Sequence, residues 1–411
     1  MKRIVLSIVF VICAYTSVLA QTAKPEQVGL SSERLKRVHD LMERRIAARD
    51  ISGAVTLVAR NGQIAYLDAQ GVMDIETNKP MTKDAIFRIA SMTKPIVGTA
   101  ILMMMEEGKV RLTDPVSRFI PEFKELKVAV AQPAPGQAGA RGAAPRFYAV
   151  PAEREITIKD LLTHTSGLVS GSISTAEAGK IQRKPGETLA DYIPRLGQVP
   201  LEFQPGSRWS YSPGAGFDTL GRIVEIVSGQ SLDQFLKQRI FDPLGMKDTF
   251  FNISEPQKSR VVTMYQKTAK GLEKSANQPA PPTTYFSGSG GLSSTADDYV
   301  KFAQMLVNGG QLNGKRLLSP RSVELMGSPF APDTLPGRAR GEAWGLSVRV
   351  ITDAVARGTY LSNGSFGWQG AFGTHFWVDP KEKLVGLLLV QTSNQEMIRD
   401  FENAVLQSVV E

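Results

Sequence analysis

Apolar residues near the start of the chain recur at helical spacing and then give way to two strand-like runs. Leu35, Val38, Leu41, Met42 and Ile46 follow a helical spacing, which predicts an amphipathic helix. Residues 54–59 and 64–67 are β-prone and flank Asn61-Gly62, the arrangement that most strongly signals a hairpin. We therefore predict a helix followed by an antiparallel pair of strands.

The middle of the chain is dominated by helical patterns. Residues 92–107 are apolar almost all round and are closed by Gly108, so they predict a helix buried in the middle of the protein. Residues 129–144 are mostly Ala, Pro, Gly and Gln, which predicts a flexible surface insertion. Helical patterns then prevail over residues 157–248.

Strand-like patterns return in the last third of the chain. A helix is predicted over residues 298–307, strands over 344–350, 374–378 and 384–392, and a last helix over 395–409. Strands at both ends with helices between them predict an α+β fold (an α/β sandwich). In it one antiparallel sheet, assembled from N- and C-terminal segments and flanked by helices, carries an inserted and mostly helical lobe.

The first twenty residues have the features of an export signal. Lys2 and Arg3 precede a short apolar run, and Val18-Leu19-Ala20 supplies the small residues that a signal peptidase reads. The run is shorter than the ~20 residues that cross a bilayer comfortably. We predict a signal peptide over residues 1–20 and a periplasmic or secreted protein with no stable membrane span after cleavage. An uncleaved N-terminal anchor is the alternative.

Composition narrows the class of protein. The chain has 411 residues, of which 42% are hydrophobic and 21% charged, which excludes disordered, collagen-like, coiled-coil and disulfide-scaffold proteins. The one cysteine, Cys13, lies in the predicted leader, so the mature chain would fold without disulfides. A net charge of +8 without a run of basic residues speaks against nucleic acid as a partner.

Several kinds of catalytic site are missing from the sequence. His39, His164 and His375 lie far apart and form no metal-binding pattern, so we expect no metal and give His164 a structural role. The chain has no G-x-S-x-G nucleophile elbow. It also has no Walker A loop and no G-x-G-x-x-G. We therefore expect neither a nucleotide nor any other organic cofactor.

Ser91-Met92-Thr93-Lys94 is the S-x-x-K match that remains. Residues three apart share a helix face, so Lys94 should lie one turn from the Ser91 hydroxyl. A buried lysine on an apolar helix loses its proton more easily, as a base must. The helix start also offers backbone N–H groups for an oxyanion. Since this composition predicts roughly one or two such matches by chance, the motif alone is weak.

Two further segments are candidates. Tyr211 lies on a loop bounded by Pro and Gly, and its phenol could relay a proton between the serine and a leaving group. The alternative is that Trp209 and Tyr211 are core aromatics. The glycines of 367–373 suggest an edge strand that a ligand can approach closely, with an exposed N–H as second oxyanion donor. The alternative there is a glycine-rich turn.

Together and in this order, these motifs resemble the serine β-lactamase and penicillin-binding-protein superfamily. The similarity is greatest to its class C-like branch, which includes the family VIII carboxylesterases, and it implies a β-lactamase/transpeptidase-like fold. It runs from about Gly53 to Gln391. The segments that carry it are residues 87–94, 161–168, 203–212, 241–246, 290–297 and 370–374.

The resemblance implies functions for individual residues. Ser91 becomes the nucleophile, Lys94 its basic partner and Tyr211 the second proton carrier. The backbone N–H groups of Ser91 and Ala371 form the oxyanion hole. The third motif of the family would bind substrate through Trp368, Gln369 and Gly370.

The resemblance also implies one serine-hydrolase domain over residues 21–411. Its α/β lobe is formed by residues 30–112 and 286–411, and its helical lobe by residues 113–285.

Two departures from the family pattern bear on the substrate. Trp368 replaces the Lys or His that holds a substrate carboxylate in β-lactam-processing enzymes, and esterases of the branch typically carry Trp there. Pro213 replaces an Asn and offers no side-chain hydrogen bond. Both changes weaken recognition of β-lactams and peptides more than that of esters.

We therefore predict an exported serine hydrolase that forms an acyl-enzyme on Ser91 and acts on a small-molecule ester or amide. A carboxylesterase for short-chain or apolar esters is favoured. The alternatives are a β-lactamase or D-amino-acid-specific peptidase, a non-catalytic penicillin-binding-like protein, and acyl transfer to an acceptor other than water.

Overall fold

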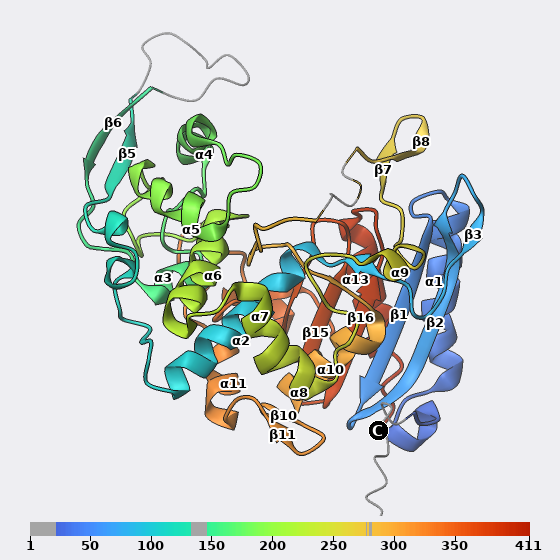
Figure 1. The fold of residues 1–411 in the computed structure, drawn as a ribbon. Helices are drawn as coiled ribbons and strands as arrows, with labels where there is room; N and C mark the ends of the chain where they lie inside the picture. The colour runs from blue at the N-terminus through green and yellow to red at the C-terminus, as the bar shows by residue number, and fades with distance from the viewer. Residues whose placement is uncertain (1–21, 133–145, 277, 279–281) are drawn as a thin grey trace, which may run out of the picture.

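An eight-stranded antiparallel sheet forms the centre of the protein (Figure 1). The computed structural model describes residues 22–132, 146–276, 278 and 282–411. The C-terminal strand β16 pairs with the N-terminal strand β1, which confirms the predicted α+β fold with a sheet assembled from both ends of the chain. The strand order is β12 (Glu342–Trp344), β13 (Arg349–Ile351), β14 (Phe366–Gln369), β15 (His375–Asp379), β16 (Leu384–Leu389), β1 (Gly53–Arg60), β2 (Gln63–Asp74) and β3 (Lys79–Pro80).

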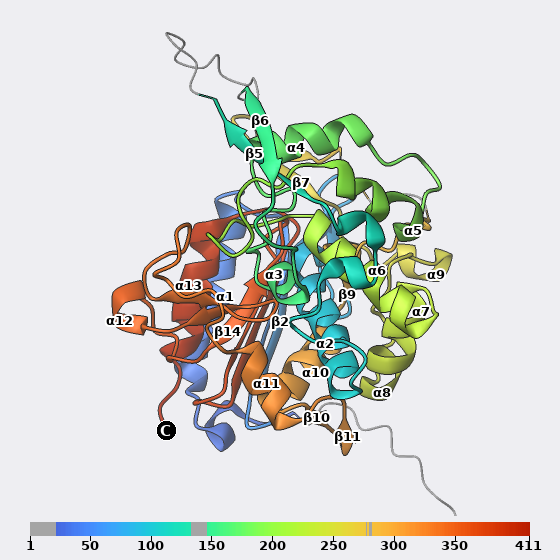
Figure 2. The ribbon, with the colours of Figure 1, turned by 90° about the vertical axis from the view of Figure 1, so that its left-hand side faces the viewer.

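Helices cover both faces of this sheet (Figure 2). On one face lie α1 (Ser32–Ala47) and α13 (Gln395–Leu406), which also contact each other. On the other face α10 (Ala296–Val307) lies against β1, β15 and β16. Every residue of β1 is buried, because this strand lies inside the sheet and beneath both layers.

The hairpin between β1 and β2 is confirmed. Asn61 and Gly62 have φ angles of 52° and 79°. Two successive positive φ angles are what a two-residue type I′ turn requires, and Asn-Gly adopts them at low cost. The turn chemistry therefore fixes the strand pair that the sequence predicts.

The apolar segment after Ser91 forms α2 (Thr93–Glu106), in which every residue from Thr93 to Met104 is buried. This confirms the predicted central helix. It contacts α6 and α7 and so joins the sheet to a mostly helical region. The helices of that region are α3 (Ile158–Leu162), α4 (Ser172–Ala178), α5 (Leu189–Tyr192), α6 (Ala215–Ser228), α7 (Leu232–Leu236), α8 (Asp242–Leu244) and α9 (Glu255–Lys258).

Four small two-stranded sheets and two further short helices also belong to the described part of the chain. One small sheet projects from the helical region, and another lies near β3 at the opposite end of the molecule (Figure 1). These elements are β4 (Phe87–Arg88) with β9 (Ser293–Ser294), β5 (Lys127–Ala131) with β6 (Phe147–Pro151), β7 (Tyr265–Thr268) with β8 (Gly271–Lys274), β10 (Gln311–Leu312) with β11 (Lys315–Arg316), α11 (Pro320–Met326) and α12 (Ala354–Arg357).

The prediction of one strand over residues 344–350 is wrong. The segment is split between β12 and β13 by a turn in which Ser347 has a φ of 78°. The Ser347 N–H donates to the carbonyl of Leu162 at 3.1 Å, and its side chain lies where a Cβ on Gly98 would be. Because these contacts come from distant parts of the chain, local hydrophobicity could not reveal the break.

Two other expectations need correction. Residues 129–131 of the predicted flexible insertion belong to β5 and pair with β6, and residues 133–144 lie outside the described part of the chain. Gly367 is not on an edge strand, because it pairs with Arg349 on one side and Trp377 on the other. The open side lies further along β14, where Trp368 and Gln369 pair with β15 alone.

The predicted signal peptide, residues 1–20, lies outside the described residues. Within the part of the chain that the structure describes, we find no helix with both the length and the apolar character needed to span a membrane.

Candidate active site

Ser91 lies in a single 3₁₀ turn, Ala90–Met92, between β4 and α2. Ala90 has a φ of 45°, an uncommon value for a residue with a side chain, and such values concentrate at functional sites. The pairing of β4 with β9 holds the turn from one side. Ser91 is therefore presented at the head of the buried helix, as the S-x-x-K spacing predicts.

Lys94 lies directly below the Ser91 hydroxyl. Its Nζ is 3.1 Å from Ser91 Oγ and donates to the carbonyls of Pro213 at 2.9 Å and Ser289 at 2.8 Å. The residue is completely buried, and this burial lowers the pKa of Lys94, while Tyr211 and Asp218 oppose the shift.

Two of the three contacts of Lys94 Nζ are carbonyl oxygens, and the third is the Ser91 hydroxyl. A carbonyl only accepts hydrogen bonds, so two N–H groups serve Pro213 and Ser289. Once the amine is uncharged, its lone pair faces the Ser91 O–H, which can turn to donate. This geometry suits a base that removes the serine proton.

Tyr211 approaches the same amine from the loop before α6. Lys94 Nζ lies 5.0 Å from the centre of the Tyr211 ring. The indole Nε1–H of Trp368, on β14, donates to the Tyr211 phenol oxygen at 3.2 Å. The structure thus brings Ser91, Lys94, Tyr211 and Trp368 together from three separate segments of the chain.

The loop of the third motif, residues 370–374, packs against the turn that carries Ser91. The Thr374 hydroxyl donates to the carbonyl of Ile89 at 3.2 Å, and a Cβ at Gly370 would approach the same oxygen to 2.5 Å. Only a glycine lets the loop come this close. The contact brings Ala371 to the same cleft as Ser91.

The three residues that are predicted to bind substrate, Trp368, Gln369 and Gly370, make contacts within the protein. Trp368 bonds to Tyr211, and the Gln369 amide donates to the Gln395 side chain at 2.9 Å. Gly370 supports the serine turn. Substrate binding by these three residues stays a prediction.

Asp218 is a residue that sequence reasoning missed. From α6 it accepts the Tyr285 hydroxyl at 2.8 Å, the Ser287 hydroxyl at 2.8 Å and the Ser289 N–H at 3.0 Å. These bonds hold the loop whose Ser289 carbonyl accepts from Lys94. The signal that could have revealed Asp218 is a carboxylate among the apolar positions of a helix.

His164 is buried beside this site. Its Nδ1 accepts the N–H of Ser212 at 3.1 Å, and its ring centre is 4.5 Å from that of Tyr211. Burial holds the pKa of His164 well below its usual range. The imidazole is therefore neutral and carries its proton on Nε2. Its contacts with Ser212 and Tyr211 support the loop that carries Tyr211.

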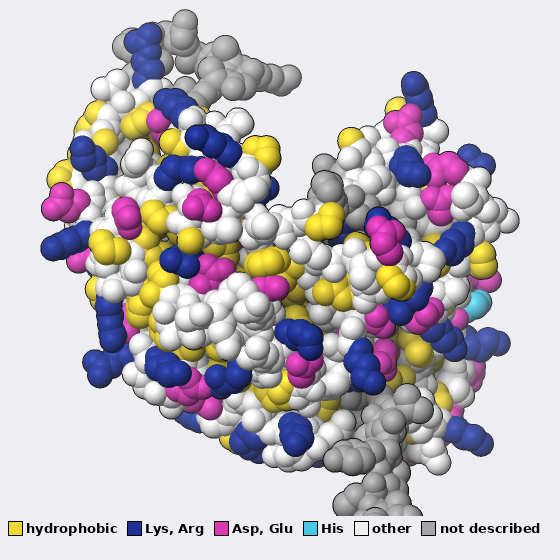
Figure 3. Space-filling model, viewed as in Figure 1, with side chains coloured by type: hydrophobic (Ala, Val, Ile, Leu, Met, Phe, Trp, Pro, Cys, Tyr) yellow, Lys and Arg dark blue, Asp and Glu magenta, His cyan; other side chains and the backbone are white. Residues whose placement is uncertain are grey.

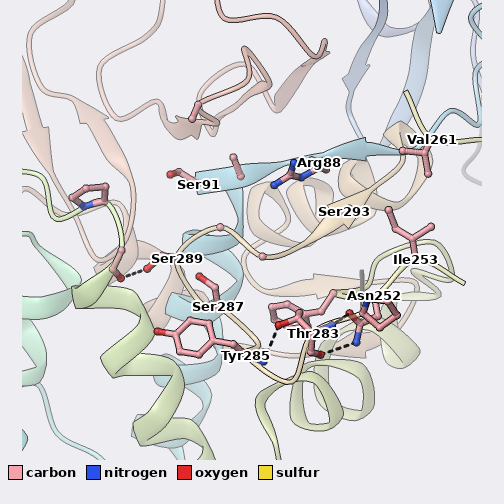
Figure 4. A pocket seen from close by; sticks show the side chains of 18 of the residues that line it. Arg88, Ser91, Asn252, Ile253, Val261, Thr283, Tyr285, Ser287, Ser289 and Ser293 are labelled. Atoms are coloured by element: carbon pink, nitrogen blue, oxygen red, sulfur yellow. Dashed lines mark hydrogen bonds between the residues drawn. The ribbon is translucent and has the colours of Figure 1, made fainter. Parts of the chain in front are cut away.

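A cleft of about 790 Å³ opens at Ser91. Ser91, Ala371 and Arg88 are among the residues that line it. Val261 lies beyond Arg88, and Tyr285 lies across the cleft from Ser91 (Figure 4). The molecular surface is hollowed between its two upper projections (Figure 3). Among the described residues, no group of three or more His, Cys, Asp or Glu is arranged to hold a metal ion.

The amino-acid sequence is similar to those of known proteins over most of its length. Protein Rv1367c of Mycobacterium tuberculosis is 37% identical over 356 residues, which cover 83% of this chain and 86% of that protein. Esterase EstB of Burkholderia gladioli is 30% identical over 401 residues, which cover 88% of this chain and 91% of that protein.

A solved structure is also similar to this chain over most of its length. EstCE1, described as a hydrolase with promiscuous acyltransferase activity, superposes with a TM-score of 0.76 at 27% identity. The match covers 91% of this chain and 99% of EstCE1. The resemblance read from the motifs, including its esterase-like branch, is confirmed by these relatives. Since residues 38–410 match the Beta-lactamase family, the chain is a serine hydrolase that belongs to this family.

Proposed function

We propose that the protein is a carboxylesterase that forms an acyl-enzyme on Ser91. The observation that carries this proposal is the buried Lys94 amine, 3.1 Å from Ser91 Oγ, with two carbonyls as its other partners. A binding protein has no need for a buried lysine beside a serine hydroxyl, whereas a nucleophilic serine needs such a base.

The reaction begins when neutral Lys94 takes the proton of Ser91. Oγ bonds to the ester carbon, and the carbonyl oxygen becomes an oxyanion at the N–H groups of Ser91 and Ala371. The bond between the acyl carbon and the alcohol oxygen then breaks. The proton reaches the leaving alcohol through Lys94 and Tyr211.

Water completes the cycle by the same path in reverse. It gives a proton to the same pair of residues and attacks the acyl carbon, and the bond to Ser91 breaks as Oγ recovers its proton. The net reaction converts an ester and water into an acid and an alcohol, and the enzyme returns to its starting state.

Two substitutions in the family motifs favour an ester over a β-lactam or a peptide. At Trp368 a neutral indole stands where a cation would hold a substrate carboxylate. At Pro213 the side chain makes no hydrogen bond, and its carbonyl serves Lys94. The similarity to esterase EstB points the same way.

Hydrolysis of 4-nitrophenyl butyrate, compared with that of nitrocefin, tests the choice of substrate. We expect the ester to turn over and Ser91→Ala to abolish that turnover, and a fluorophosphonate should label Ser91. Rapid nitrocefin hydrolysis without ester hydrolysis would favour a β-lactamase. Failure of any such reagent to modify Ser91 would leave a non-catalytic penicillin-binding-like protein.

Export is also part of this proposal. The features of residues 1–20 support cleavage near Ala20 and a periplasmic or secreted enzyme. N-terminal sequencing of the protein from the periplasm or the medium should begin at or near Gln21. Recovery of the intact N-terminus in the membrane fraction would support an uncleaved anchor instead.

A further inference from the structure

The cleft beside Ser91 is lined by cations and by no acidic side chain among the described residues. Its positive groups are Arg88, Arg183 and Lys258. The remaining polar lining groups are neutral hydroxyl and amide groups, and the cleft therefore favours a negatively charged guest.

Of the three cations, Arg88 lies closest in sequence to the reaction centre. Lys258 is exposed and forms an ion pair with Glu255. Arg183 is exposed at the rim, 4.4 Å above the Tyr285 ring. Arg88 is partly buried on β4, three residues before Ser91, and both side chains lie along the same wall of the cleft (Figure 4).

The contacts of Arg88 fix its position in the cleft wall. Its guanidinium lies 4.9 Å from the ring centre of Phe372, the residue after Ala371, and Nη1 lies 3.0 Å from Met264 Sδ. Its backbone is held by the Gln391 amide, which accepts from the Arg88 N–H at 3.2 Å and donates to its carbonyl at 3.1 Å. A cation fixed in this way can bind a carboxylate with little further ordering.

The position of Tyr211 decides which part of an ester enters the cleft. The alcohol must leave beside the group that protonates it, and Tyr211 does not line the cleft. Ser91 and Ala371 do line it. The acyl chain therefore extends from Ser91 into the cleft, past Arg88 and along the apolar side chains of Phe251, Ile253 and Val261.

We propose that Arg88 binds a carboxylate at the far end of the acyl chain, so that the preferred substrates are monoesters of dicarboxylic acids. This inference rests on the proposed esterase function. The apolar side chains contact the methylene groups of the acyl chain. Trp368, which replaces the cation of the family's third motif, is not among the residues that line this cleft.

Two esters with acyl chains of equal carbon number test the proposal on the full chain. Mono-4-nitrophenyl glutarate ends in a carboxylate where 4-nitrophenyl valerate ends in a methyl group. We expect kcat/KM to be about 10- to 100-fold higher for the glutarate ester, as charge-assisted hydrogen bonds of this kind contribute. The preference should fall with added salt. Hydrolysis by Ser91→Ala is subtracted as background.

Arg88→Gln should bring the ratio of the two kcat/KM values close to 1, and Arg88→Lys should give an intermediate ratio. Arg321→Gln is the matched control, because Arg321 is exposed on α11, and it should leave the ratio unchanged. If Arg88→Gln fails to fold, Arg88→Lys and the salt dependence of the wild-type ratio still provide the test.

The proposal is refuted if the wild-type ratio is 1 or less, or if Arg88→Gln keeps the wild-type ratio. In either case hydrolysis of the valerate ester through Ser91 would leave the proposed esterase function intact. If neither ester is hydrolysed and no fluorophosphonate labels Ser91, the proposed function itself fails, and the substrate preference fails with it.

Discussion

Gly370→Ala is a small change that should separate the predicted oxyanion donors. The new Cβ would lie 2.5 Å from the carbonyl oxygen of Ile89 and would also collide with the Thr374 hydroxyl. Ordinary contacts of this kind begin at 3.4 Å. The third-motif loop must therefore move away from the serine turn by about 1 Å. Because Ile89 lies two residues before Ser91, the movement changes the distance between the turn and Ala371.

The expected loss follows from the geometry of the oxyanion hole. A donor acts when it lies 2.7–3.1 Å from the developing oxyanion, so a shift of about 1 Å takes the Ala371 N–H out of range. Loss of one such donor lowers kcat by about 10²–10³, or about 2.7–4 kcal/mol in the barrier. The KM for an ester should change much less, since the oxyanion forms only in the transition state.

The assay is steady-state hydrolysis of 4-nitrophenyl butyrate, with thermal unfolding measured on the same samples. Gly179→Ala is the control, because a Cβ at Gly179 meets nothing within 4 Å, and it should keep wild-type kcat. If Gly370→Ala folds normally and keeps kcat within about threefold of wild type, Ala371 is not an oxyanion donor held by this contact.

Three further predictions concern proton transfer. Lys94→Ala and Tyr211→Phe should each lower kcat at least a hundredfold, within the ~10²–10⁴ of general acid–base catalysis, and near-normal turnover by either folded variant would show that the base is misassigned. Trp368→Phe removes the N–H donor to Tyr211 and should lower kcat by about 5- to 10-fold, the value of one hydrogen bond; unchanged kinetics would show that this bond does not serve catalysis. Asp218→Asn removes a negative charge that raises the pKa of Lys94. Since Lys94 must be neutral to act, the acid limb of the pH profile of kcat/KM should move to lower pH, and an unmoved limb would contradict Lys94 as the titrating base.

Local patterns in the sequence predict the elements whose structure depends on neighbouring residues. The hairpin at Asn61-Gly62 follows from the turn chemistry of two residues, and the buried helix α2 follows from an apolar surface that has no polar face. The S-x-x-K spacing predicts the contact between Ser91 and Lys94 for the same reason, because one helical turn separates them. The ordered motifs then indicate the family and, with it, the α+β fold.

Tertiary structure decides what depends on segments that are distant in sequence. Ser347 breaks a predicted strand because Leu162 and Gly98 form its surroundings. Asp218 is connected to Lys94 by hydrogen bonds through the Ser289 loop. The position of Arg88 on the wall of the cleft likewise becomes visible only once β4 is paired with β9. Hydrophobic periodicity reports which face of an element is buried, whereas the partner that buries it is selected by packing over the whole chain.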